Sequence, residues 1–186
     1  KVTDMSFMFN KAYAFNQPLN NWNVSSVTDM SDMFGYMFNQ PLNDWDVSNV
    51  TTMKGMFWAT FNQPLDKWDV SKVTDMAWMF NDSKAFNQPL NSWDVSSVTN
   101  MYAMFRDTDN FNQPLNDWDV SSVTDMGEIF NNTKVFNQPL NKWNVSNVTN
   151  MRLMFRDSKA FNQPLDKWNV SSVTNMVNMF HNAKAF

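Results

Sequence analysis

Residues 86–110 read FNQPLNSWDVSSVTNMYAMFRDTDN, and close copies of this stretch fill most of the 186-residue chain. The signature Phe-Asn-Gln-Pro-Leu returns every 23 or 25 residues, and Phe186 begins another copy. Self-similarity at such a period is typical of solenoids, in which each unit buries its apolar face only against its neighbours. The sequence therefore predicts a single solenoid over 1–186 with about seven and a half repeats. Because the chain starts and stops inside a unit, we expect it to be a fragment of a longer protein.

Two sets of apolar positions predict the elements of each unit. The motif Leu-x-x-Trp-x-Val contains an alternation, as at Trp93 and Val95, which is typical of a short strand with one buried face. Met101, Met104 and Phe105 follow at i, i+3 and i+4, the spacing of one face of a short helix. We therefore expect an α/β repeat solenoid with one short parallel strand and one short helix per 23–25-residue unit.

Stacking of the units predicts internal columns of equivalent residues, about 4.8 Å apart, the spacing of neighbouring strands. One such column would contain the tryptophans of the motif, which are Trp22, Trp45, Trp68, Trp93, Trp118, Trp143 and Trp168. The Asn-Gln pair of the signature never varies within the chain. It is either a structural ladder of side-chain amides or a row that binds a ligand, and we favour the structural interpretation because the fold's own packing usually sets an invariant position.

Composition excludes several classes of function. The net charge is −4 and no basic cluster could follow a phosphate backbone, so we expect no nucleic-acid partner. No apolar run approaches the roughly 18 residues that span a bilayer. Cysteine is absent and His181 is the only histidine, and the chain has no Gly-rich phosphate loop. We therefore expect no enzyme, no catalytic residue and no bound cofactor.

The repeated string FNQPLNxWDVSxVTxMxxMF resembles the BspA-like repeat of bacterial surface proteins and mycoplasma lipoproteins, also called the PARCEL repeat. The resemblance covers essentially the whole chain; its departures are two short units and Ile129 in place of a Met. It implies a leucine-rich-repeat-like, right-handed solenoid in which Leu-x-x-Trp-x-Val takes the place of the usual strand motif. It also implies a cell-surface or secreted location and adhesion or binding to an extracellular or host protein, with no catalytic residues.

Charged positions on both sides of each Trp are the first set of candidate partner-binding residues. The position after Trp forms what we call the Asp column, consisting of Asp46, Asp69, Asp94 and Asp119, with Asn in the flanking units. The position before Trp varies more and includes Asp44, Lys67, Asp117, Lys142 and Lys167. Stacked carboxylates repel one another, by roughly 1 kcal/mol per neighbouring pair in high dielectric. Ca²⁺ on the Asp column would relieve this repulsion, but we favour a solvated acidic strip without a metal.

Four aromatic residues outside the repeated pattern form the second set. Tyr36, Trp58, Trp78 and Tyr102 occur in four successive units, and the first two lie in loops that are two residues shorter than the others. Grouped exposed aromatic side chains often mark a contact site. The alternative, which we favour, is local repacking, in which bulky rings cover the space left by the shortened loops.

These features support two functional hypotheses. The first is a non-catalytic binding or adhesion module at the cell surface, which presents a repetitive face to a macromolecular partner. The second is a structural spacer or a filament subunit that assembles end to end, since uncapped ends of a solenoid expose apolar surface and unpaired backbone groups.

Overall fold

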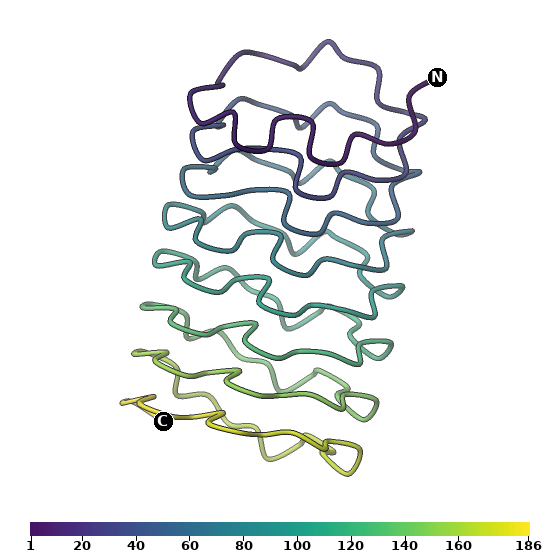
Figure 1. The fold of residues 1–186 in the computed structure, drawn as a ribbon. Coiled ribbons are helices and arrows are strands. Elements are labelled where there is room, and N and C mark those ends of the chain that lie inside the picture. The colour runs from purple at the N-terminus through teal and green to yellow at the C-terminus, as the bar shows by residue number, and fades with distance from the viewer.

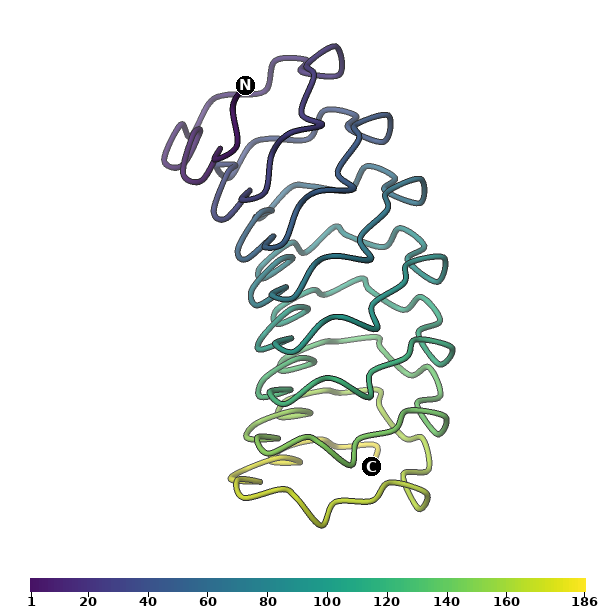
Figure 2. The same cartoon turned by 90° about the vertical axis from the view of Figure 1, so that its right-hand side faces the viewer.

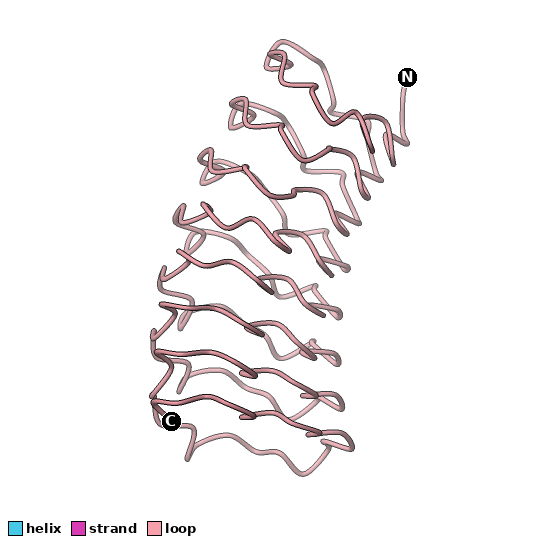
Figure 3. Cartoon of the chain, turned by 60° about the vertical axis from the view of Figure 1, so that its left-hand side comes forward, coloured by secondary structure: helices cyan, strands magenta, loops and turns pink.

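The computed structural model, which describes residues 1–186, is a stack of coils in which the chain makes one circuit per repeat unit (Figure 1). The two termini lie at opposite ends of the stack. Seven isolated parallel β-bridges join successive coils, from Asp4–Asp29 at one end to Asn150–Asn175 at the other. None of the 78 backbone–backbone hydrogen bonds belongs to a helix or to a strand, and the whole chain is drawn as loop (Figure 3).

The expected α/β, leucine-rich-repeat-like architecture with a strand and a helix in each unit is therefore wrong. In the segment that was expected to be helical, every second amide donates to the next coil. Trp78 N–H bonds to Tyr102 O at 2.8 Å and Phe80 N–H to Met104 O at 3.0 Å. A helix would use these amides for bonds to the carbonyl four residues earlier. Trp78 also has a φ of 62°, in the left-handed region, which interrupts a right-handed helix.

Consecutive turns explain why the sequence nevertheless has a helical spacing. Met79 N–H bonds to Met76 O at 3.2 Å, closing a four-residue turn. The residue at the third position of this turn has positive φ in almost every unit, as Gly55 does in the unit before. This is the geometry of a type II turn. The turn brings i, i+3 and i+4 to the inside of the coil without forming a helix.

The expected strand fails for a different reason. Trp118 and Val120 are buried, as their alternation predicts, but no backbone hydrogen bond joins neighbouring coils at these residues. The coils are joined there by the side chain, because the Trp118 indole Nε1 donates to Leu90 O at 3.0 Å. The same bond recurs from Trp45 to Trp168. Trp22 belongs to the first unit, where no earlier coil offers a Leu carbonyl to its indole, and it is 38% exposed. The prediction of a buried Trp column is therefore wrong for this residue alone.

Aromatic stacking makes the spacing of the coils unequal around the circuit. Backbone hydrogen bonds at the bridges imply the roughly 4.8 Å of paired strands. Ring centroids are 5.6–6.0 Å apart in the column of Met-Phe phenylalanines and 5.9–6.5 Å in the signature Phe column. They are 6.5 Å apart where two Trp rings stack. Ring centroids in the aromatic columns are therefore farther apart than the predicted 4.8 Å. The stack is also bent, most clearly toward its N-terminal end (Figure 2).

The signature amides are structural. Asn87 Oδ1 accepts the backbone N–H of Asn112 at 3.0 Å and Nε2 of Gln113 at 3.0 Å. The bond to the backbone recurs from Asn16 to Asn137. The favoured interpretation of the Asn-Gln pair is confirmed. Each Asn satisfies an amide of the next coil that has no backbone partner, which leaves these side chains committed to the scaffold.

Candidate functional site

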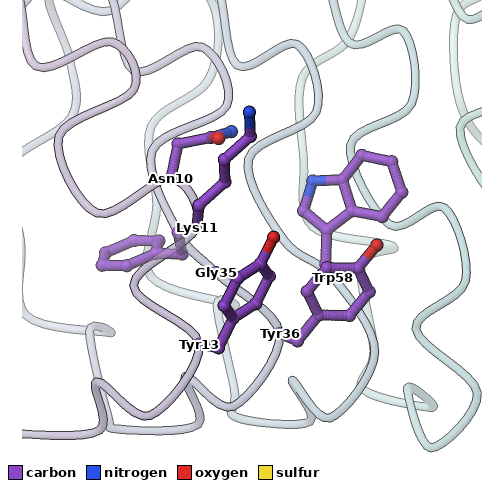
Figure 4. A pocket seen from close by; sticks show the side chains of 7 residues that line it. Asn10, Lys11, Tyr13, Gly35, Tyr36 and Trp58 are labelled. Atoms are coloured by element: carbon purple, nitrogen blue, oxygen red, sulfur yellow. The ribbon is translucent and has the colours of Figure 1, made fainter.

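The surface departs most from the repeat at the shortened loops of units 15–37 and 38–60. A cavity of about 160 Å³ opens there, beside the longer loop of residues 10–14 (Figure 4). We call it the aromatic hollow; its lining residues are Asn10, Lys11, Tyr13, Phe34, Gly35, Tyr36 and Trp58. Three successive coils contribute to it, so the stacking of unequal loops creates the hollow.

Three rings form a row along one side of the aromatic hollow. The Tyr13 and Tyr36 centroids are 5.9 Å apart with planes tilted by 35°, and the Tyr36 and Trp58 centroids are 6.1 Å apart with a tilt of 43°. Tyr13 is 58% exposed and Tyr36 is 46% exposed. Trp58 is half-buried, and its indole Nε1 donates to Gly55 O at 2.8 Å. The two tyrosines make no hydrogen bond within the chain through their hydroxyl groups, so both hydroxyls are available to a ligand.

Polar groups border the same hollow. The Asn10 amide donates to Asp32 O at 3.4 Å, and Lys11 is exposed with no acidic side chain within ion-pair distance. Gly35 lies where the coils approach closely, since a Cβ there would be 3.1 Å from Ala12 O. A larger residue would have to push the coils apart. The row of rings therefore has a rigid backbone below it and an unpaired cation beside it.

The other two predicted aromatics form a separate cluster. The Trp78 and Tyr102 rings are 5.1 Å apart, and the Arg106 guanidinium lies 5.6 Å from the centre of the Trp78 ring. Arg106 Nη1 is 3.1 Å from Oε2 of the buried Glu128, whose Oε1 accepts the Tyr102 hydroxyl at 2.6 Å. Burial, and then the bond to Glu128, raises the pKa of Tyr102 to about 12.

The four predicted aromatics thus divide into two pairs with different surroundings. Trp78 and Tyr102 lie in units of full length, so repacking over a shortened loop does not apply to them, and their polar and cationic partners are all within the chain. Tyr36 does lie in a shortened loop, but it leaves the hollow open. Sequence reasoning missed Tyr13, although it precedes its signature Phe by two residues, as Tyr36 does.

The Asp column is exposed, and each member binds its own chain. Asp46 Oδ1 accepts the Ser48 N–H at 3.1 Å and the Ser48 hydroxyl at 2.6 Å. The corresponding Ser N–H bonds to Asp69, Asp94 and Asp119. The Ser side chain, and then its backbone amide, holds the pKa of Asp46, Asp69 and Asp119 below the usual value. No group of three or more His, Cys, Asp or Glu side chains is arranged to hold a metal ion.

The charged residues before each Trp pair with one another across coils. Lys67 Nζ is 2.7 Å from Asp44 Oδ1, and Lys142 Nζ is 2.6 Å from Asp117 Oδ1. Lys167 has no such partner. All four paired side chains are more than half exposed, and ion pairs of this kind contribute about 0–1 kcal/mol. These residues lie on one exposed surface strip. Most of its charges are already paired within the chain, so it is a weaker candidate for a binding site than the aromatic hollow.

Comparison with known families adds one match. A family model described as "Mycoplasma protein of unknown function, DUF285" matches residues 1–92, 37–132 and 115–186, which together cover the chain. No curated protein and no solved structure matches the chain. The structure contains no membrane-spanning helix.

Proposed function

The chain belongs to the Mycoplasma protein family of unknown function DUF285, and from this membership and its surface we propose that it is a non-catalytic binding module of the BspA-like type. In this proposal the module is displayed at the cell surface or secreted, and it binds an extracellular or host macromolecule. The coil stack acts as a rigid support, and the residues that depart from the repeat carry the recognition.

The observation that carries the proposal is the row of exposed rings at the aromatic hollow. Large aromatic side chains at the centre of an interface contribute more binding energy than most other residues. Here Tyr13 and Tyr36 are about half exposed and have unused hydroxyl groups. In the longer loops of later units the equivalent surface carries ion pairs, such as Lys134 with Asp109 and Lys159 with Asp157. One region of the loop surface therefore exposes aromatic rings, while later units expose charged pairs, which supports recognition at the aromatic hollow.

Two measurements test the proposal. Protease treatment of intact cells that express the full-length protein should remove this region if it is displayed. Purified protein should bind to cultured host cells or their extracellular matrix, and Tyr36→Ala should reduce that binding. Tyr102→Phe is the matched control, because it alters an aromatic residue of the separate Trp78 cluster. Protection of the protein until cells are lysed, with none in the medium, or equal binding by the Tyr36→Ala variant, would show that the proposal is wrong.

A further inference from the structure

We propose that the aromatic hollow binds an acidic glycan, with sugar rings stacked on Tyr13, Tyr36 and Trp58 and a sugar carboxylate bound by Lys11. This inference rests on the proposed binding function and names the chemical class of the partner. It is carried by the exposed row of aromatic rings and by the unpaired polar and charged groups at the border of the hollow.

The row of rings suits a chain of pyranoses. An aromatic face carries negative charge density, and the C–H groups on one face of a sugar ring are weakly positive, so the two surfaces attract when stacked. The ring centroids are 5.9 and 6.1 Å apart and successive planes are tilted by 35° and 43°, so the three rings form one continuous, curved row. A row of three rings is long enough to contact more than one sugar.

The polar groups provide what a glycan needs besides stacking. In the view of Figure 4 the hydroxyl groups of Tyr13 and Tyr36 point in the same direction, toward the side on which Lys11 and Asn10 extend. Neither hydroxyl has a partner in the chain, so each can donate to or accept from a sugar hydroxyl. The hollow is shallow, and a sugar bound there keeps its outer hydroxyl groups in water.

Lys11 makes an acidic sugar a better ligand than a neutral one. Its ammonium has no carboxylate partner in the structure, and of the lysines without one it is the one that lines the aromatic hollow. A charged hydrogen bond from an ammonium to a carboxylate is roughly twice as strong as a neutral one. The same cation opposes a quaternary ammonium ligand, although such ligands also favour aromatic surroundings. Nucleic acid is disfavoured by the net charge of −4.

The first test is calorimetric titration of the purified protein with hyaluronate, oligogalacturonate and sialyllactose, with maltooctaose as the neutral probe. At least one acidic probe should bind more tightly than maltooctaose. Tyr36→Ala should abolish binding, and Lys11→Gln should weaken the acidic probe by about tenfold, the loss of one charged contact, with little effect on maltooctaose. Trp78→Phe, in the separate cluster, should bind like the wild type. The inference is wrong if no acidic probe binds, or if either hollow variant binds as tightly as the wild type.

A second test separates this inference from the proposed function. Host cells are treated with hyaluronidase, pectin lyase or sialidase before the adhesion measurement. Loss of adhesion after one treatment supports a glycan partner. Adhesion that survives all three treatments but is reduced by Tyr36→Ala identifies a protein partner, which overturns the glycan inference and leaves the binding function intact. Absence of adhesion by the wild-type protein, together with calorimetric binding of an acidic probe, contradicts the host-binding role and supports the glycan site.

Discussion

Replacing Trp118 with Phe tests whether side-chain hydrogen bonds take the place of strand pairing on one side of the stack. Trp118 is 4% exposed, and its indole Nε1 donates to Leu90 O at 3.0 Å. Phenylalanine cannot donate, so Leu90 O would lose this bond but keep the one from the Trp93 backbone N–H at 3.1 Å. The loss of one of two hydrogen bonds costs about 0.5–1.5 kcal/mol. The smaller ring leaves a cavity that costs about 1 kcal/mol more. We expect the free energy of unfolding to fall by about 1.5–2.5 kcal/mol.

Urea unfolding followed by far-ultraviolet circular dichroism measures this change without depending on tryptophan fluorescence. Trp22→Phe is the matched control, because it makes the same chemical change at a Trp that is 38% exposed and donates to no carbonyl. Its cost should stay under about 1 kcal/mol. If the two substitutions cost the same, or if Trp118→Phe costs less than 1 kcal/mol, indole bonds between coils do not stabilise the fold in the way we infer.

Four further predictions concern the scaffold. Asn112→Ala should lower the free energy of unfolding by about 1–3 kcal/mol because it leaves an amide of the next coil without an acceptor, whereas Asn162→Ala, in the last full unit, should have little effect; urea titrations compare the two. Gly55→Ala should reduce the melting temperature, since its φ is 58° and a Cβ there would clash with Asp32 Oδ1; an unchanged melting temperature would contradict the geometry. Because folding lowers the pKa of three members of the Asp column, their contribution exists above the unfolded pKa of about 3.9 and is lost as the pH falls through the folded values. Acid melts should show this loss, and Ser71→Ala should make the pH dependence shallower. Melting temperatures in calcium and in chelator should agree, because each member of the Asp column already binds its own Ser; stabilisation by calcium would restore the metal alternative.

The apolar pattern predicted which residues face inward better than it predicted the backbone. Met101, Met104 and Phe105 are buried as expected, yet they lie on turns. Four-residue turns begin here at every second residue, as at Met101 and Ala103, and they place i, i+3 and i+4 on the inside just as a helix would. What distinguishes a helix from a series of turns is the acceptor of each backbone N–H. Here the neighbouring coil supplies that acceptor at every second residue.

The sequence also predicted part of the candidate site. Tyr36 and Trp58 are two of the four aromatic residues that the sequence predicts as a contact site in successive units, and both line the aromatic hollow. The sequence could not predict that Trp78 and Tyr102 form a second, separate cluster. That cluster depends on contacts with Arg106 and the buried Glu128, which come from two different coils. Aligning the partial first unit with the loops of the following units would have added Tyr13 and Lys11 to the predicted contact site.

The sequence alone determined that equivalent residues stack in columns, because a repeat that cannot bury its apolar face by itself must pack against its own copies. It also determined that the signature Asn is part of the scaffold, since every unit must satisfy the same backbone group. Only the tertiary structure decided that the coils contain neither helix nor strand. Backbone amides and Trp indoles donate to carbonyl groups of neighbouring coils. Residues such as Trp78 have a positive φ, which turns the backbone so that these bonds can form. The aromatic hollow also arises at that level, because it exists only where loops of different length are stacked side by side.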